Sequence, residues 1–417
     1  MTRAEIITIG TEIIVGHIVN TNVQYIAKAL AERGFQVQFQ TSVCDNKEEL
    51  KAVLQVAIGR ADLIITTGGL GLTENDVTRD AVSEFFGVSL IHNKDACVRI
   101  QKLMDEQYGN LTEGHNKQTL VPEGSLVIAN DNGTATGFAF RSNDKEIVCL
   151  PGVPREMQFM LHKYLGICSL RDTRKEGCTL SRNIHTFGIP ERTVEDTVKK
   201  CVFHDRGQIK TMTLVHNGIV TIHLHAIAAT REDAVKLLDM AETDIRKEFG
   251  HAIFGVGDET LEYTVATLLK KYRKTIAVAE SCTGGLVADK LTNIPGISEF
   301  FMEGIVAYSN RVKIDRLGVP EDLIIKHGAV SPQVARAMAE GIRKKASTDI
   351  GIGITGIAGP TGGTKEKPVG LVYITVAVDD SIEVKECRFR GSRIDIKKFS
   401  ANTALNMVRI LLLDCCL

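Results

Sequence analysis

The sequence has no tryptophan, and aromatic residues make up only 5% of its 417 residues. Its 50 basic and 51 acidic side chains give a net charge of -1, so it lacks both the basic field and the stacking surface that generic nucleic-acid binding requires. It has no hydrophobic run long enough to span a membrane, and its N-terminus does not resemble a secretory leader. These absences predict a cytoplasmic protein that binds small molecules, with neither nucleic acid nor membrane as a partner.

Cysteine pairs with the C-x-x-C spacing are missing as well. The ten cysteines lie scattered along the chain, and no two of them form a C-x-x-C motif. Zinc modules and small disulfide frameworks both depend on a regular cysteine spacing. The pattern therefore predicts reduced cysteines in a cytoplasmic protein.

The sequence does contain an alternation of short β-branched runs with helix-like segments. The runs "EIITIG", "QVQFQTSV" and "DLIITTGG" read as strands, and amphipathic segments separate them. Such an alternation predicts βαβ units and a mostly parallel sheet, with ligand sites at the C-terminal ends of its strands. A chain of this length also exceeds one ordinary core. We expect an α/β protein in three parts: residues 1–170 with the mostly parallel sheet, a small α+β module at 171–252, and an α/β sandwich at 255–417.

Three turns of the first part carry polar residues where strands end. They are "GTEIIVGHIVNTN" (residues 10–22), "TTGGLGLTENDVTRD" (66–80) and "LPGVPREM" (150–157). Glycine-rich turns that lead into helices expose backbone N–H groups to phosphate oxygens, and carboxylates beside them suit a hard cation. A single turn of this kind would favour a purely structural role for its glycines, but three in one βαβ array favour a phosphate-bearing ligand. The candidate ligand-binding residues are Asn20, Gly69, Gly71 and Thr73, and the candidate metal ligands are Glu12 and Asp76.

The middle part offers one pair of metal-ligating side chains. His223 and His225 stand two apart in "GIVTIHLHAIA", on one face of an expected strand. A third ligand is not apparent nearby, so we prefer a structural role for both histidines.

The stretch "IAVAESCTGGLVADK" (residues 276–290) decides how the third part is interpreted. A buried-strand pattern stops at Glu280, and Ser281 and Cys282 then precede an expected helix. N–H groups at such a corner, from Thr283 to Gly285, would stabilise an oxyanion or a phosphate. The alternatives are that Ser281 is only a helix N-cap, or that Cys282 is the nucleophile, since thiolates attack more readily.

Two residues downstream of Ser281 favour catalysis. Tyr308 and Lys313 follow another expected strand, in "GIVAYSNRVKIDRLGV". A serine needs a neighbouring base, and a desolvated lysine or a polarised tyrosine supplies one. Because the third part has only one histidine, His327, a Ser-Lys-Tyr arrangement is favoured over a Ser-His-Asp triad.

A further strand ends in "GITGIAGPTGG" (residues 353–363), a loop that fits a phosphate cradle. Arg393 precedes the last helix and would add a charge-assisted phosphate contact. The candidate substrate-binding residues of the third part are Thr283, Gly284, Gly285, Thr355, Gly356, Gly359, Gly362 and Arg393.

Taken together, the three N-terminal motifs with "AESCTGG", "YSNRVK" and "GITGIAGPTGG" resemble the CinA family over the whole chain. For the first part the resemblance implies a molybdopterin-binding-like domain that hydrolyses ADP-ribose to AMP and ribose 5-phosphate with a divalent cation. Two positions depart from the family pattern: Leu72 replaces a proline, and Asn75 precedes Asp76 where the family has two aspartates. The missing carboxylate would lower metal affinity.

For the third part the resemblance implies a nicotinamide-nucleotide amidase without a cofactor. Such an enzyme hydrolyses the carboxamide of nicotinamide mononucleotide (NMN) to nicotinate mononucleotide and ammonia. Ser281 then becomes the nucleophile, Tyr308 and Lys313 its activating partners, and Thr355 a residue lining the nucleotide site. The resemblance also implies a homodimer.

Three hypotheses follow. The first is a bifunctional hydrolase of pyridine-nucleotide salvage that acts on NMN and ADP-ribose. The second keeps the first domain as a non-catalytic module that binds molybdopterin or a nucleotide. The third, an accessory role in competence or DNA damage, gains no support from the near-neutral charge.

Overall fold

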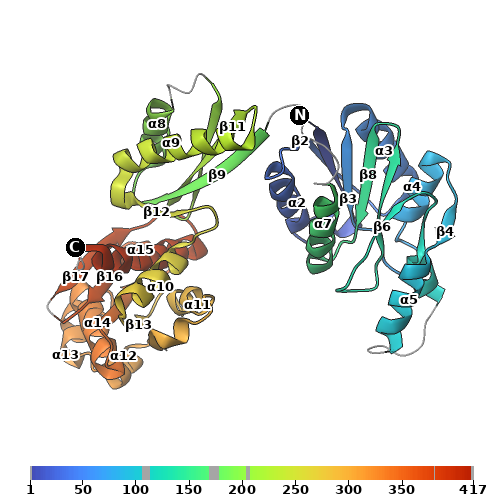
Figure 1. Ribbon diagram of the computed structural model, residues 1–417. Coiled ribbons are helices and arrows are strands. Elements are labelled where there is room, and N and C mark those ends of the chain that lie inside the picture. The colour runs from blue at the N-terminus through green and yellow to red at the C-terminus, as the bar shows by residue number, and fades with distance from the viewer. Residues whose placement is uncertain (1, 106–112, 169–177, 203–206, 380, 415–417) are drawn as a thin grey trace. The chain divides into compact units, whose positions relative to one another are not determined.

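The computed structural model describes residues 2–105, 113–168, 178–202, 207–379 and 381–414 (Figure 1). Their contacts divide the chain into two compact units. One comprises Met1–Ser181 with His225–Leu237, and the other comprises Arg182–Leu224 with Leu238–Leu417. Within the described ranges, every helix is too short or too polar to cross a membrane.

A six-stranded sheet organises the N-terminal part, in the order β2-β1-β3-β8-β7-β6. The first four strands of this order run parallel, and the last two pair in antiparallel fashion, so the sheet is mostly parallel as expected. The strands are β1 (Arg3–Ile9), β2 (Gln36–Val43), β3 (Leu63–Thr67), β6 (Leu126–Ile128), β7 (Gly137–Ser142) and β8 (Lys145–Leu150).

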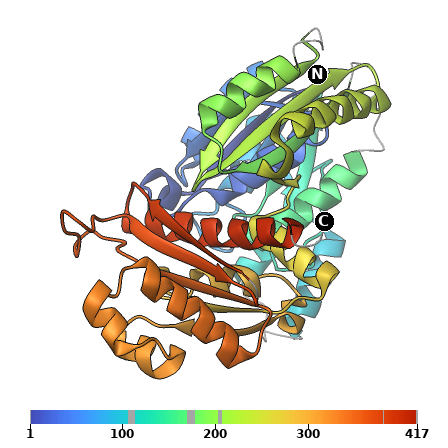
Figure 2. The same ribbon diagram turned by 90° about the vertical axis from the view of Figure 1, so that its left-hand side faces the viewer.

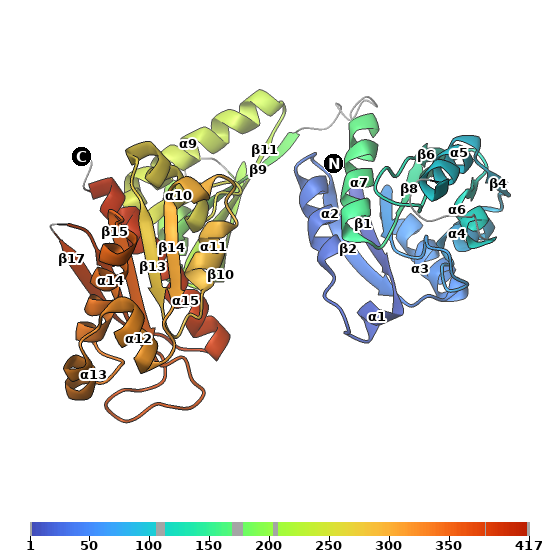
Figure 3. The same ribbon diagram turned by 90° about the horizontal axis from the view of Figure 1, so that it is seen from below.

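Helices cover both faces of this sheet, as Figure 3 shows. On one face α2 (Thr21–Ala31) and α7 (Pro154–Cys168) enclose one apolar core, and on the other α3 (Lys47–Arg60) and α4 (Thr78–Phe86) enclose a second. The remaining elements are α1 (Thr11–Ile14), α5 (Lys94–Leu103), α6 (Glu113–Gln118) and the two-stranded sheet of β4 (Leu90–His92) and β5 (Leu120–Pro122).

A four-stranded sheet in the order β10-β11-β9-β12 follows. β12 (Ile253–Val256) pairs antiparallel with β9, so the sheet extends beyond residue 252, where the sequence predicted the module to end. Its other elements are β9 (Cys178–Phe187), α8 (Glu191–Cys201), β10 (Ile209–His216), β11 (Ile219–Ala228), α9 (Arg231–Phe249) and the 3-10 turn Gly250–Ala252.

The C-terminal sheet has the order β14-β13-β15-β16-β17. In Figure 2 the last helix, drawn in red, lies along one face of this sheet, and the orange helices lie on the other, which gives the expected α/β sandwich. The strands are β13 (Ile276–Glu280), β14 (Phe301–Val306), β15 (Ile350–Gly356), β16 (Leu371–Ala377) and β17 (Ile382–Arg388). The helices are α10 (Leu261–Tyr272), α11 (Leu286–Thr292), α12 (Asn310–Leu317), α13 (Glu321–His327), α14 (Pro332–Ala346) and α15 (Arg393–Asp414), with a 3-10 turn at Ile297–Glu299.

Small residues on one face of the two central strands let α14 lie close to the sheet. A Cβ on Gly353 would overlap the Ala335 carbonyl oxygen, and one on Gly351 would overlap that of Ala339. Ile352, between the two glycines, points into the opposite core beside α10 and α15. This alternation explains the "IGIGI" sequence of residues 350–354.

Candidate active sites

Ser281 occupies the turn directly after β13, the strand next to β15 in the centre of the C-terminal sheet. Its backbone N–H donates to the Ile354 carbonyl oxygen at 2.9 Å, which ties the turn to β15. The first helix after the turn begins at Leu286 and has Gly285 as its N-cap residue. Ser281 is therefore not the N-cap of that helix, and the alternative that gave it only this role is wrong.

Lys313 lies on α12, the helix that follows β14, and its side chain reaches Ser281 at the end of the neighbouring strand β13. Its Nζ lies 3.1 Å from Ser281 Oγ, 2.8 Å from the Ala307 carbonyl oxygen and 3.2 Å from the Tyr308 carbonyl oxygen. The side chain is 1% exposed, and this burial lowers the pKa of its ammonium group. The structure thus brings Ser281 and Lys313 together, as the sequence predicted.

Lys313 Nζ donates to three oxygen atoms in this structure, and a neutral amine would fit the same three contacts. A neutral lysine has two N–H bonds and one lone pair, arranged roughly tetrahedrally about Nζ. The Ala307 and Tyr308 carbonyls are pure acceptors, so they take the two N–H bonds. In the neutral form the lone pair would be left to accept the hydroxyl proton of Ser281 across the same 3.1 Å contact, which is the arrangement that a general base requires.

Cys282 is packed into the apolar core beside the same turn. Burial, with a smaller contribution from the nearby Glu280 carboxylate, raises the pKa of its thiol to about 12. The thiol is therefore protonated at neutral pH, whereas thiol chemistry needs the thiolate. This environment disfavours Cys282 as the nucleophile.

Tyr308 meets Lys313 only through its backbone. Its side chain is exposed, and its hydroxyl accepts a 2.9 Å hydrogen bond from Arg393 Nη2. Arg393 Nη1 also donates to the Gly359 carbonyl oxygen at 2.7 Å. Arg393 therefore joins the tyrosine to the glycine-rich loop. Among the described residues the Tyr308 hydroxyl makes no bond to Ser281, and in this structure it does not activate the serine directly.

The glycine-rich loop after β15 borders this group. The hydroxyl of the buried Thr355 donates to the Ala329 carbonyl oxygen at 2.8 Å, and Gly356 packs tightly against β16. Gly359 and Gly362 have φ values of 74° and 86°, in the left-handed region that favours glycine. These contacts give Thr355 and Gly356 a role in holding the loop.

Glu280 is a residue of this site that the sequence analysis treated only as a strand end. Its buried carboxylate accepts hydrogen bonds from the N–H groups of Gly285, Val287 and Ala288, at 2.9 to 3.1 Å. The Gly284 N–H donates to the Ser281 carbonyl oxygen at 3.1 Å. Two of the three N–H groups predicted to face an oxyanion are therefore used inside the turn.

Thr283 supplies the remaining N–H group of that prediction. This N–H group makes no hydrogen bond to any other described residue. The side chain of Thr283 is fully buried, and its Oγ1 also has no partner among the described residues.

In the N-terminal part, the three polar turns meet. Asn22 Nδ2 donates to Thr67 Oγ1 at 2.9 Å and to the Gly152 carbonyl oxygen at 2.8 Å. The Gly68 N–H donates to the Leu150 carbonyl oxygen at 3.0 Å, so the second and third turns are also tied together. Asn20 caps α2 and donates to Thr8 Oγ1. The ends of β1, β3 and β8 thus form one site, as their parallel order requires.

The side chain of Asp76 holds the glycine-rich loop of this site in place by accepting hydrogen bonds from it. Its Oδ1 accepts from the Gly71 N–H at 2.7 Å, and its Oδ2 accepts from the N–H and hydroxyl of Thr73 at 2.8 and 2.7 Å. Lys117 donates to the Thr73 carbonyl oxygen, and Gly69 adopts a φ of 65° against Thr78. Both carboxylate oxygens of Asp76 are therefore committed to the loop.

A buried arginine beneath that loop escaped the sequence analysis. Arg79 is fully buried, and burial lowers the pKa of its guanidinium to about 10. It donates to the carbonyl oxygens of Leu70 and Thr136, and Gln118 also donates to that of Leu70. Arg79 therefore supports the loop from below, an interaction that its place between two acidic residues did not reveal.

Glu12 and Asp76, the two residues predicted to hold a cation, do not belong to a preformed metal site in the part of the chain that the structure describes. Glu12 is an exposed side chain whose carboxylate folds back over Gly10. Within the described ranges, no three His, Cys, Asp or Glu side chains gather as metal ligands. In the middle module His223 instead pairs with Asn183 at 2.7 Å and His225 with Ser181 at 2.8 Å. Such cross-strand partners support the structural role expected for these two histidines.

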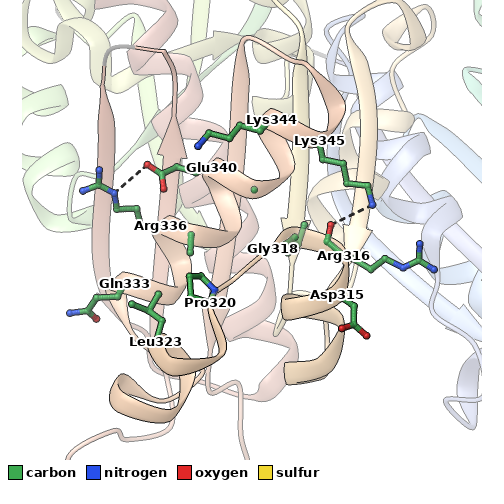
Figure 4. A pocket seen from close by; sticks show the side chains of 13 residues that line it. Asp315, Arg316, Gly318, Pro320, Leu323, Gln333, Arg336, Glu340, Lys344 and Lys345 are labelled. Atoms are coloured by element: carbon green, nitrogen blue, oxygen red, sulfur yellow. Dashed lines mark hydrogen bonds and ion pairs between the residues drawn. The ribbon is translucent and has the colours of Figure 1, made fainter.

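A groove of about 950 Å³ lies away from these sites, between α12, α13 and α14 (Figure 4). Charged side chains line much of it, and Lys345 donates to the Arg316 carbonyl oxygen across it. None of the predicted site residues borders it. Its size therefore does not mark it as the reaction site.

Comparison with known families divides the chain into three consecutive matches. Residues 5–168 match the model described as a probable molybdopterin binding domain. Residues 181–255 match the damage-inducible protein CinA KH domain, and residues 258–412 match the CinA C-terminal domain.

Relatives resemble the protein over nearly its whole length. A CinA-like protein of Dictyoglomus thermophilum is 42% identical over 98% of this chain and 98% of its own. A putative competence-damage inducible protein of Caldicellulosiruptor bescii is 42% identical over 99% of both chains. The crystal structure of a competence/damage inducible protein from Agrobacterium tumefaciens is 38% identical and covers 37% of this chain and 93% of its own, with a TM-score of 0.36. The chain therefore belongs to the CinA family, with an N-terminal molybdopterin-binding-like domain.

Proposed function

We propose that the C-terminal domain is a nicotinamide-nucleotide amidase that converts NMN to nicotinate mononucleotide and ammonia. The observation that carries this proposal is the 3.1 Å contact between Lys313 Nζ and Ser281 Oγ, made by a buried lysine whose other contacts are two carbonyl oxygens. This is the pairing of a nucleophile with a base that amide hydrolysis requires.

The chemistry follows from that pair. Neutral Lys313 takes the hydroxyl proton of Ser281 as Oγ attacks the carboxamide carbon. The lysine then gives this proton to the departing nitrogen, and ammonia leaves an acyl-enzyme. Lys313 next takes a proton from water, whose oxygen attacks the ester. The proton returns to Ser281, and nicotinate mononucleotide is released. The Thr283 N–H, unlike those of Gly284 and Gly285, remains to donate to the oxyanion.

The test is ammonia release from NMN by purified wild type, Ser281→Ala and Cys282→Ala, each checked for folding. We expect Ser281→Ala to be inactive and Cys282→Ala to keep its activity. The reverse result would make Cys282 the nucleophile. A folded wild type that releases no ammonia would refute the amidase proposal.

For the N-terminal domain we propose hydrolysis of ADP-ribose to AMP and ribose 5-phosphate. The supporting observation is the junction of the three polar turns, where Asn22 joins Thr67 and Gly152 beneath the glycine-rich loop. Glycine-rich backbone at strand ends is a common phosphate site in α/β domains. Together the two activities would make a bifunctional hydrolase of pyridine-nucleotide salvage.

A divalent cation would assist this hydrolysis by neutralising charge on the pyrophosphate. Because Asp76 is committed to the loop, only Glu12 is left free among the two predicted ligands. Magnesium is commonly held by one or two carboxylates together with substrate phosphates and water, and one carboxylate fits that manner of binding. AMP formation with and without added Mg²⁺ is the test. Binding of ADP-ribose without AMP would favour the non-catalytic module.

We retain NMN and ADP-ribose as the small-molecule partners and a homodimer as the assembly, and we propose no nucleic-acid partner. The middle module matches a KH-domain description, and KH domains clamp nucleic acid with a G-x-x-G loop. Residues 178–256 contain no G-x-x-G sequence. Filter binding that shows tight, salt-sensitive association with DNA or RNA would contradict the proposal and revive an accessory role in competence.

A further inference from the structure

The first turns of α15 carry two cationic side chains, Arg393 and Lys397, and Lys397 lies at the turn that contains Ser281. Lys397 stands four residues after Arg393 on this helix, so both side chains share one helix face. The Nζ of Lys397 lies 3.6 Å from the position that a Cβ would take on Gly284. The ammonium group therefore lies over the turn that carries Ser281.

Gly284 leaves the space beneath this ammonium group open. Its φ of 64° lies in the left-handed region, where a residue with a side chain would be strained. Its hydrogen atom takes the place of a Cβ that would contact Lys397. Gly284 belongs to the predicted site, whereas nothing in the sequence around Lys397 pointed to that lysine.

Neither cation is neutralised by a carboxylate within the described ranges. Arg393 bonds to two uncharged groups, the Gly359 carbonyl and the Tyr308 hydroxyl. Asp395, the acidic residue between the two cations in sequence, caps the start of the helix through Ser392 instead. Like charges four residues apart on a helix disfavour the helix unless an anion comes between them.

We propose that Lys397 and Arg393 together bind the phosphate of the nucleotide, and that Lys397 makes the site select nucleotides over nucleosides. A phosphate dianion would neutralise both cations, and charge-assisted hydrogen bonds to arginine and lysine are strong. The inference rests on the proposed amidase function, because it assumes that the carboxamide lies at Ser281. It goes further by naming the phosphate as the group that is selected and Lys397 as the residue that selects it.

The test compares NMN with nicotinamide riboside, which carries the same carboxamide and ribose without the phosphate. We expect Lys397→Gln to raise the KM for NMN about 10- to 100-fold with little change in kcat, and to leave nicotinamide riboside turnover unchanged. Lys397→Arg should restore most of the NMN affinity. Lys398→Gln, which removes the neighbouring lysine, is the matched control and should behave as wild type.

A binding measurement separates this inference from the amidase proposal. Calorimetric titration of Ser281→Ala with NMN and with nicotinamide riboside needs no turnover. Loss of NMN affinity on adding Lys397→Gln, but not Lys398→Gln, would support phosphate recognition even if no ammonia were released. Equal losses for NMN and nicotinamide riboside, or no loss for either, would overturn it.

Discussion

Lys313 Nζ lies 3.1 Å from Ser281 Oγ, and both groups are nearly excluded from solvent. The lysine comes from α12 and the serine from the turn after β13, so the pair forms only where two parallel strands end side by side. Parallel strands β13 and β14 thus place a base next to a hydroxyl 32 residues away in sequence.

Replacing Lys313 should strongly reduce amidase activity. Loss of a general base costs about 10²- to 10⁴-fold in rate, so Lys313→Gln should lose that much in kcat. Lys313→Arg should be equally impaired, because a guanidinium does not give up its proton near neutral pH. Ammonia release from NMN is the measurement, with Lys326→Gln on the exposed face of α13 as the control. Near-normal activity of folded Lys313→Arg would exclude a base at this position.

The wild-type rate should rise with pH. Burial lowers the pKa of Lys313, and the neutral form is the active one. Activity should therefore be lost as pH falls below this lowered pKa and should level off above it, at a pH lower than an exposed lysine would require. A pH profile of kcat/KM for NMN measures this. A rate that falls on the alkaline side instead would mean that the protonated lysine is the active form.

Tyr308→Phe should weaken substrate binding more than chemistry. The hydroxyl bonds to Arg393 rather than to Ser281, so its removal costs one hydrogen bond, about 0.5–1.5 kcal/mol, or roughly 2- to 13-fold in kcat/KM. We expect most of the loss in KM. Steady-state kinetics with NMN distinguish the alternatives: a large fall in kcat at unchanged KM would support the direct activating role that the sequence predicted.

Glu280→Gln should destabilise the turn that carries Ser281. The carboxylate accepts three N–H bonds, and an amide would point N–H donors at some of them. We expect a loss of about 1–3 kcal/mol in the free energy of unfolding, together with reduced amidase activity. Denaturant unfolding checks this, with Glu299→Gln at an exposed position as the control. A variant as stable as wild type would show that the buried bonds contribute little.

Asp76→Asn should impair ADP-ribose hydrolysis and spare the amidase. The change replaces one of the two oxygens that hold Gly71 and Thr73 with an amide nitrogen, so the loop loses its fixed geometry, at a cost of about 10- to 100-fold in AMP formation. NMN hydrolysis by the same preparation is the internal control for folding. Unchanged AMP formation would mean that this loop does not face the substrate.

The sequence predicted most of this architecture because its periodicities reflect burial. β13 is buried along its whole length, and the "IAVAE" run identified it as a strand directly. The pairing of Ser281 with Lys313 was also predictable, since both follow strands whose C-terminal ends meet in a parallel sheet.

Other features depend on side-chain directions that a sequence does not encode. Tyr308 presents its carbonyl to Lys313 and its hydroxyl to Arg393, although its position alone suited either contact. Asp76 looked like a metal ligand because carboxylates serve both metals and loop N–H groups. The prediction that Arg393 precedes the last helix was wrong, because α15 begins at Arg393, and its polar first turns carry none of the apolar periodicity that marks a helix in a sequence.

The complete burial of β13 should also slow the exchange of its amide hydrogens with solvent. Amide hydrogens in a central strand that is packed on both faces exchange with solvent only when the surrounding unit opens as a whole. The Ser281 N–H, bonded to Ile354, should share that slow exchange. The loop of residues 360–366, which is largely exposed, should exchange orders of magnitude faster. The backbone of Ser281 would thus keep its position over times in which residues 360–366 open many times.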